Sequence, residues 1–171
     1  MKKTRRFVAL LLAAVLALAL FTACGAAGAE EPQSAIGKVY EDWFVEQLNS
    51  KRPADKPVQK VDVKHSEMMA ALAKIGKDGK FTAGDGWGEE ANGTEKESYY
   101  WVIISDPRAW DYGVSETKAV ALTPENLTQY GPDYYFNDTQ LYRINEYDIV
   151  TRVMDGKTYV AVYLHFEKAK S

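Results

Sequence analysis

Hydrophobic side chains recur at helical spacing directly after Ser34. Ser34 is a suitable N-cap, and Pro53 follows the last position of the pattern, Asn49, closely enough to end a helix. The apolar positions of this stretch are Ile36, Val39, Tyr40, Trp43, Phe44 and Leu48. This spacing predicts one long amphipathic helix whose apolar side packs against the rest of a domain.

A second helix is predicted after a short polar loop. Residues 50–57 hold two prolines and four charged side chains, which is typical of a loop. Val61 and Val63 either alternate in a short strand or lead into the helix that follows. Helical spacing then runs through Met68, Met69, Leu72 and Ile75. We favour a helix capped by Ser66 and stopped by Gly76.

Residues 77–97 lack any clear period. The stretch holds five glycines and one tryptophan, Trp87, among mostly polar side chains, which predicts a long loop. Loops of this length in compact domains are usually either functional or disordered. Trp87 then either covers a pocket or meets a partner, or it packs on the protein's own core. Asp85, Glu89 and Glu90 lack the spacing of a calcium loop, so we predict no metal site here.

Continuous apolar runs predict strands after residue 97. Tyr99 to Ile104 reads as a central strand, and Ala119 to Leu122 as another. Thr123-Pro124 has the pattern of an N-cap followed by proline, which predicts a short helix that ends at Gly131-Pro132.

The clearest local pattern lies near the C-terminus, where Asp155-Gly156 separates two alternating runs. This dipeptide is the strongest short-range signal for a two-residue hairpin turn, and it pairs Met154 with Lys157. One face of the hairpin is largely apolar and is expected to pack on the helices: Ile149, Thr151, Val153, Thr158, Val160, Val162, Leu164 and Phe166. The opposite face collects Val150, Arg152, Met154, Lys157, Tyr159, Ala161, Tyr163 and His165.

Two N-terminal helices followed by an antiparallel, meander-like sheet predict a single α+β domain over residues 34–171. The arrangement resembles a curved sheet folded around a helix, as in cystatin-like or nuclear-transport-factor-like domains. That resemblance concerns architecture only, because a fold does not confer a function.

The first 24 residues have the layout of an export signal. A basic start, Lys2 to Arg6, precedes an uninterrupted apolar run from Phe7 to Phe21, which is too short for a permanent membrane-spanning helix. Phe21-Thr22-Ala23-Cys24 then resembles the lipobox of bacterial lipoprotein signal peptides. The resemblance implies cleavage after Ala23 and acylation of Cys24. It predicts a signal peptide at 1–23, a lipidated cysteine and flexible tether at 24–33, and a lipid-anchored protein on the extracytoplasmic face of the cell membrane.

Charge and cysteine content narrow the choice of partners. Residues 1–23 hold four of the 21 basic side chains and none of the 24 acidic ones, so the rest of the chain has a net charge of −7. An acidic chain without a basic footprint argues against nucleic acid as a partner. Cys24 is the only cysteine, so no intramolecular disulfide can form and no thiol is left for nucleophilic catalysis.

The candidate ligand-binding residues are few. His165 shares its predicted hairpin face with Arg152, Tyr159 and Tyr163, and Trp87 lies in the glycine-rich stretch. The alternative is that this hairpin face is an ordinary amphipathic outer surface. His65, at the entrance of the second helix, is expected to be a solvated or capping imidazole. We predict no catalytic residue, metal ligand or cofactor.

These observations favour a membrane-anchored binding module. Tyrosine and tryptophan are abundant in the second half of the chain, and they suit sugar stacking and protein interfaces. The expected partners are therefore the membrane, through acyl chains on Cys24, and a glycan, a small ligand or an envelope protein. Two alternatives stay open: a structural or accessory lipoprotein without its own ligand, and an envelope hydrolase that uses His165 or the acidic residues of the glycine-rich stretch.

Overall fold

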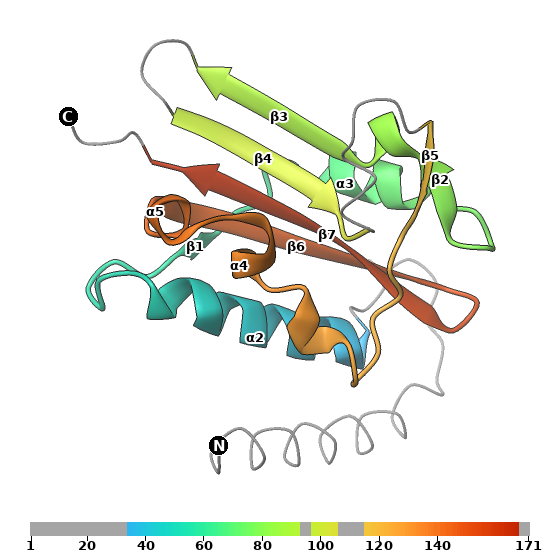
Figure 1. The fold of residues 1–171 in the computed structure, drawn as a ribbon, viewed down its shortest axis with the longest axis horizontal. Helices are drawn as coiled ribbons and strands as arrows, with labels where there is room; N and C mark the ends of the chain where they lie inside the picture. Colours follow the sequence, from blue (N-terminus) through green and yellow to red (C-terminus); the bar gives the residue numbers. More distant parts are fainter. Residues whose placement is uncertain (1–33, 93–96, 106–114, 168–171) are drawn as a thin grey trace.

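The computed structural model describes residues 34–92, 97–105 and 115–167 (Figure 1). The predicted signal peptide, Cys24 and the tether at 24–33 lie outside the described residues. The described part mixes helices with an open sheet, which confirms the α+β class.

Four α-helices and seven strands make up the described architecture. The helices are α2 (Ala35–Ser50), α3 (His65–Leu72), α4 (Pro132–Tyr135) and α5 (Asp138–Leu141). The strands are β1 (Gln59–Lys60), β2 (Lys80–Thr82), β3 (Trp87–Asn92), β4 (Glu97–Ile103), β5 (Glu116–Lys118), β6 (Ile144–Met154) and β7 (Lys157–Phe166).

The main sheet has five strands in the order β1-β6-β7-β4-β3, and β2 pairs with β5 in a separate two-stranded sheet. Neighbouring strands of the main sheet are antiparallel except for β1, which runs parallel to β6. The predicted meander is therefore wrong in detail. β7, the last strand in sequence, lies between β6 and β4, and a parallel edge strand is added by the segment between α2 and α3.

The strands β6 and β7 meet at a tight turn. Met154 lies opposite Lys157, and the two residues between them have positive φ angles, +48° at Asp155 and +72° at Gly156. Two positive φ angles define the turn that matches the right-handed twist of paired strands. The turn aligns the two longest strands of the protein, and their alternate positions form the two sides of the sheet.

Helix α2 covers one side of the sheet, which we call the α2 face. Ser34 caps this helix, because its hydroxyl oxygen accepts a hydrogen bond from the Gly37 amide at 3.1 Å. Gly37 lets the helix approach the sheet, since a side chain there would collide with Thr151 on β6. The core between helix and sheet is made by buried side chains that include Tyr40, Phe44, Leu48, Ile149, Val160, Val162 and Leu164.

Helix α3 covers the opposite side, which we call the α3 face (Figure 1). Its Met68 and Leu72 are fully buried in a second core. The sheet contributes Trp101, Ile103, Val150, Tyr159, Ala161 and Tyr163 to that core. The expectation that both helices pack on one face is therefore wrong, because each side of the sheet has its own helix.

Several local expectations also need correction. The stretch 77–97 is not a continuous loop in its described part, because it holds β2, one 3-10 turn at Ala83–Asp85 and β3. The second helix begins at His65 with Lys64 as its N-cap residue, so Ser66 is not the cap. The strand predicted at Ala119 to Leu122 is β5 (Glu116–Lys118) instead, followed by isolated bridges at Ala119 and Leu122.

The segment between β5 and β6 is helical at different places from those predicted. Thr123-Pro124 begins a turn, and a 3-10 helix follows at Leu127–Gln129. Pro132 does not end a helix but begins α4 as its first residue. α5 follows at once and lies near the end of β7, whereas α4 lies further back along that strand (Figure 1).

Candidate functional site

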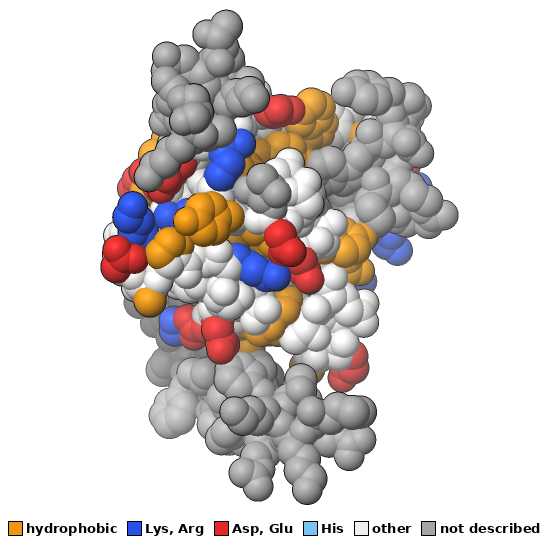
Figure 2. All heavy atoms as spheres, turned by 60° about the vertical axis from the view of Figure 1, so that its left-hand side comes forward, with side chains coloured by type: hydrophobic (Ala, Val, Ile, Leu, Met, Phe, Trp, Pro, Cys, Tyr) orange, Lys and Arg blue, Asp and Glu red, His pale blue; other side chains and the backbone are white. Residues whose placement is uncertain are grey.

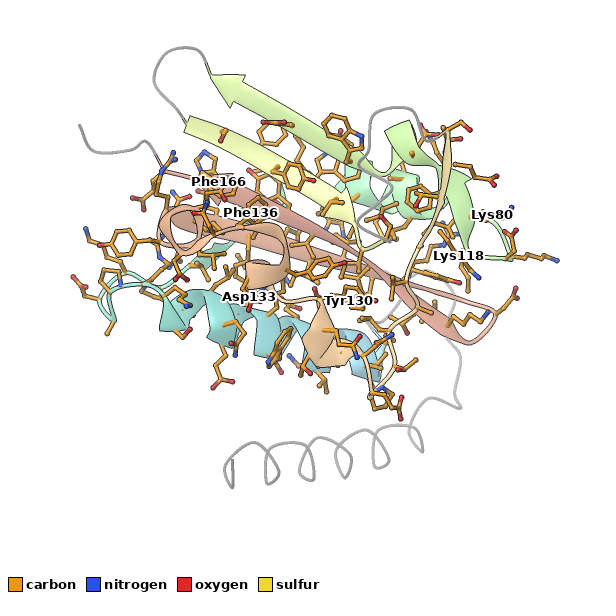
Figure 3. All side chains as sticks on the ribbon, in the orientation of Figure 1. Lys80, Lys118, Tyr130, Asp133, Phe136 and Phe166 are labelled. Atoms are coloured by element: carbon orange, nitrogen blue, oxygen red, sulfur yellow. The ribbon has the colours of Figure 1, made fainter. Side chains whose placement is uncertain are left out.

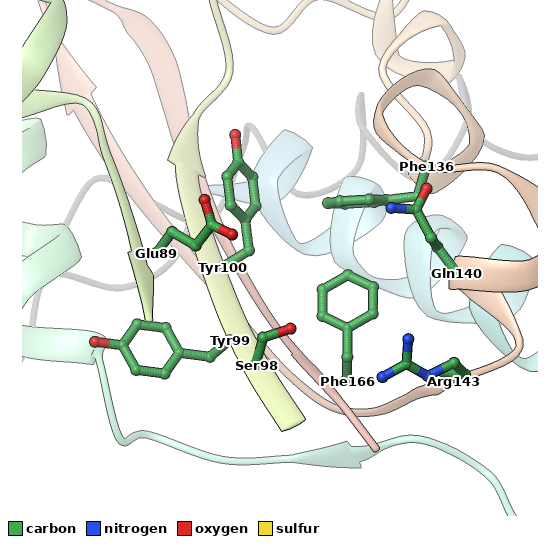
Figure 4. Close-up of a pocket in the computed structure, with 8 residues that line it drawn as sticks. All are labelled: Glu89, Ser98, Tyr99, Tyr100, Phe136, Gln140, Arg143 and Phe166. Atoms are coloured by element: carbon green, nitrogen blue, oxygen red, sulfur yellow. The ribbon is translucent and has the colours of Figure 1, made fainter. Parts of the chain in front are cut away.

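A small cavity of about 120 Å³ lies where α4 and α5 approach the ends of β4 and β7 (Figure 4). Four aromatic and four polar residues line it: Tyr99, Tyr100, Phe136, Phe166, Glu89, Ser98, Gln140 and Arg143. Figure 3 shows Phe136 and Phe166 close together at one end of the molecule, far from Lys80 and Lys118 of the two-stranded sheet. We call this cavity the α5 pocket.

Strand register explains which side chains form the wall of the α5 pocket on the sheet. Glu89 on β3 lies opposite Tyr100 on β4, and Tyr100 lies opposite Leu164 on β7. Directly opposite residues in antiparallel strands share a face, and Leu164 belongs to the core under α2. The α5 pocket therefore opens on the α2 face, at the edge of the core that α2 covers.

The other wall depends on the geometry of two short helices. The side chain of Asn137 accepts a hydrogen bond from the Gln140 amide at 3.0 Å, and the side chain of Gln140 accepts one from the Asn137 amide at 3.1 Å. This capping box starts α5 directly after Phe136. The ring of Phe136 then meets Tyr100 and Phe166 nearly edge to face, with centroids 5.6 Å and 5.1 Å apart.

Two arginines bind the chain segments beside these rings. Arg143 donates from Nε to the carbonyl oxygen of Glu167 at 2.9 Å, and a second bond to the same oxygen comes from Nη2. The buried Arg52 side chain bonds the carbonyl oxygens of Tyr142 and Ile144 and the carboxylate of Glu167. Planar guanidinium groups hold such geometry well, so the start of β6 and the end of β7 are tied together beside the cavity.

The hairpin face that the sequence predicted to bind a ligand is covered by helix α3. Tyr159 and Tyr163 are only 3% exposed and lie in the core under α3, so the expectation that they present a ligand surface is wrong. Burial raises the pKa of the Tyr163 hydroxyl, as expected for a phenol away from water. The amphipathic pattern of the strand did not predict the burial of these tyrosines. A tyrosine can lie in a core that a second helix covers, because most of its side chain is apolar.

Arg152 and His165 are not brought together. Arg152 lies opposite Tyr159, whereas His165 lies six residues further along β7, opposite Glu146. At about 3.4 Å per residue this separates them by about 20 Å. The Nδ1 atom of His165 is 2.9 Å from Oδ1 of Asn145 and 3.4 Å from the Glu146 carboxylate, so the ring contacts the start of strand β6.

Trp87 is half exposed and begins β3, opposite Val102. It is therefore on a strand and not on a loop. Glu89 of the α5 pocket lies two residues further along the same strand, so Trp87 shares its face and flanks the pocket without lining it. His165 is also near the cavity in strand register, because it lies opposite Tyr99 and next to Phe166, but it does not line the cavity itself.

A buried acid that sequence reasoning did not single out lies on the α3 face. Asp148 is fully buried, and its Oδ2 is 3.0 Å from Nδ1 of His65 at the start of α3. Burial raises the pKa of Asp148, and the hydrogen bond with His65 opposes only part of that shift. The available signal was an aspartate inside the apolar run Tyr147 to Val150. His65 thus has a structural partner in Asp148, while its side chain stays partly exposed at the start of α3, as expected for a solvated imidazole.

The described residues hold no other obvious chemistry. They include no group of three or more His, Cys, Asp or Glu side chains arranged to hold a metal ion. No helix in the described ranges is long and apolar enough to span a membrane. On the face in Figure 2, hydrophobic side chains are interspersed with acidic and basic ones and do not form one broad apolar patch.

Comparisons with known proteins give no further guidance: no protein-family model, curated protein or solved structure matches this chain. The candidate site therefore depends on its geometry alone. That geometry describes a small binding cavity with an aromatic wall and a few polar groups, which is the usual composition of a ligand pocket.

Proposed function

We propose that the protein is a lipid-anchored binding module on the extracytoplasmic face of the cell membrane, and that the α5 pocket is its ligand site. The observation that carries the proposal is the lining of this cavity, in which Tyr100, Phe136 and Phe166 lie beside Glu89 and Arg143. Aromatic surface provides most of the binding energy in such sites, and a few polar groups orient the ligand.

The anchor belongs to the same proposal. The basic start, the apolar run and Cys24 support lipidation, and two acyl chains satisfy the rule that stable anchoring takes more than one lipid signal. Residues 25–33 then tether the domain within about 30 Å of the bilayer. The likeness to cystatin-like or nuclear-transport-factor-like domains stays part of the proposal for the α2 half only, supported by the packing of α2 on β6 and β7.

Fractionation tests the anchor. Cys24→Ser removes the sulfur to which the acyl chain is attached, so we expect this variant to leave the membrane fraction, while the unchanged protein stays there in high salt. A variant that still sediments with membranes in high salt contradicts the anchor.

A ligand screen tests the α5 pocket. Thermal unfolding of the purified protein is followed by tryptophan fluorescence against glycans, peptides, small metabolites and divalent ions. A ligand at 100 times its Kd adds about 2.7 kcal/mol of stability, which raises the Tm of a domain of this size by several degrees. Phe136→Ala is expected to abolish such a shift. Tyr142→Ala changes an exposed aromatic side chain outside the cavity and is expected to preserve it.

The outcome of the screen separates this function from the second candidate, a structural or accessory lipoprotein. A shift that Phe136→Ala removes supports a ligand site in the α5 pocket. If no compound in the panel shifts the Tm, or if Phe136→Ala leaves every shift intact, the ligand site is contradicted. The accessory role is then preferred.

A further inference from the structure

We propose that the α5 pocket takes a small zwitterion, with the ligand carboxylate at Arg143 and its ammonium group at Glu89 and the aromatic rings. This inference depends on the proposed function, because it names the ligand class of the same cavity. It follows from three features of the lining: the sign and separation of the charges, the rings between them, and the size of the space.

The two charged side chains of the cavity come from separate elements. Arg143 stands between α5 and β6, whereas Glu89 lies on β3 at the far edge of the sheet. Figure 4 shows them on opposite sides of the cavity, with the side chains of Ser98 and Phe166 between them. A ligand with charges of opposite sign at its two ends can face both groups at once.

Arg143 is held in place before any ligand arrives. Its Nε and Nη2 bind the carbonyl oxygen of Glu167, and α5 begins with the capping box at Asn137 and Gln140. A guanidinium group fixed in this way loses little freedom on binding, and its positive charge favours a carboxylate in the adjoining space.

The aromatic wall suits the positive end of the ligand. The ring of Phe136 stands at 86° to that of Tyr100 and at 68° to that of Phe166, so it is steeply inclined to both neighbouring rings. The face of an aromatic ring attracts an ammonium group. Glu89 adds a negative charge on the same side of the cavity as Tyr100 (Figure 4).

The size of the cavity and the two charges in its lining favour a small zwitterion over other simple ligands. A cavity of about 120 Å³, close in size to one of about 150 Å³ that accepts benzene, favours a ligand about as large as a small amino acid. A simple anion can pair with Arg143 but not with Glu89, and a simple cation can pair with Glu89 but not with Arg143. A neutral sugar would engage neither charge, so a zwitterion fits the lining best.

Calorimetry with charge-matched probes tests the inference. The full chain is titrated with L-valine, N-acetyl-L-valine, L-valinamide and glucose. The acetyl compound lacks the ammonium charge, and the amide lacks the carboxylate. Hydrogen bonds to charged groups contribute enough that we expect each analogue to bind about 10- to 100-fold more weakly than L-valine. An analogue that binds as tightly as L-valine overturns the inference.

Paired variants locate the charges. Glu89→Gln is expected to weaken L-valine about 10-fold and to leave the weak affinity for N-acetyl-L-valine unchanged. Glu46→Gln removes an exposed acid on α2, away from the cavity, and is expected to change neither affinity. Equal affinities of the Glu89→Gln variant and the unchanged protein for L-valine contradict the assignment of Glu89.

The failure of this inference is distinguishable from that of the proposed function. Glucose binding that Phe136→Ala abolishes, without binding of L-valine, overturns the zwitterion and keeps the α5 pocket as a ligand site. If no probe binds, the zwitterion is again overturned, and the wider ligand screen then decides the function of the cavity.

Discussion

The two faces of the sheet are both buried, but they are built differently. On the α2 face, apolar side chains such as Phe44, Leu48 and Val160 form the core, and the α5 pocket opens beside it. On the α3 face, the core includes tyrosines and a tryptophan, and the buried Asp148 lies within it. A strand face with polar residues can therefore be buried under a helix when its buried acid has a hydrogen-bond partner. Here His65 is that partner of Asp148.

The largest expected effect tests whether both faces are cores. Leu48 on α2 and Leu72 on α3 are both fully buried, so each Leu→Ala substitution should lower the free energy of unfolding by about 2–5 kcal/mol. Denaturant unfolding measures both. Val153→Ala, at an exposed position of β6, is the control and should cost less than about 0.5 kcal/mol. A similarly small loss for Leu72→Ala would mean that α3 does not cover its face.

The second prediction tests whether the contact of His65 with Asp148 stabilises the fold. His65→Ala leaves the Asp148 carboxylate buried without its hydrogen-bond partner, which should destabilise the protein by about 1–3 kcal/mol at pH 7. The matched control is Ser66→Ala at the next, exposed position of α3, where a change within about 0.5 kcal/mol is expected. Equal effects of the two substitutions would show that the contact of His65 with Asp148 contributes nothing.

The third effect is the pH dependence that Asp148 confers. Because burial raises its pKa, the folded protein holds this proton more tightly than the unfolded chain does. Stability from this group is full below the ordinary pKa of 3.8 and falls as pH rises through the raised value. In the His65→Gln background, which lacks this imidazole, the Asp148→Asn chain should therefore gain stability relative to the chain with Asp148 as pH rises from about 4.

Unfolding curves of these two chains across the acidic range measure the difference directly. The two chains differ only at residue 148, so the comparison isolates the contribution of this residue. A difference that does not change with pH would mean that Asp148 titrates as an exposed acid does.

The smallest effect concerns the wall of the α5 pocket. Asn137→Ala removes the capping box of α5 and should cost about 1 kcal/mol, as measured by thermal unfolding. Asn137→Asp keeps an acceptor at the cap and should cost less than Asn137→Ala. If both substitutions cost the same, the side-chain cap does not hold α5 in place.

Much of the α2 side followed from local patterns in the sequence. The Ser34 cap, the apolar spacing to Leu48 and the Asp155-Gly156 turn act over a few residues, and the structure has a helix and a tight turn at these places. The α3 face could not be predicted in this way. Its core depends on the side of the sheet on which the second helix packs. The sequence pattern of a single strand does not show on which side a distant helix will pack.

The candidate site was largely missed for the same reason. Phe136, Gln140 and Arg143 come from two short helices, and they meet β3 and β4 only through the order of the sheet. The sequence singled out Trp87 and the acidic residues near it, but it predicted a loop where the structure has strand β3. His165, Arg152, Tyr159 and Tyr163 share a strand face as predicted, yet they do not line the cavity.

Hydrogen exchange with a bound ligand tests the central claim, that the α5 pocket and not the α3 face is the binding site. Amide exchange of the intact protein is measured with and without a compound that raises its Tm. The account predicts slower exchange at residues 136–143 and 98–100, around the cavity, and unchanged exchange in α3. Slower exchange confined to α3 would contradict it.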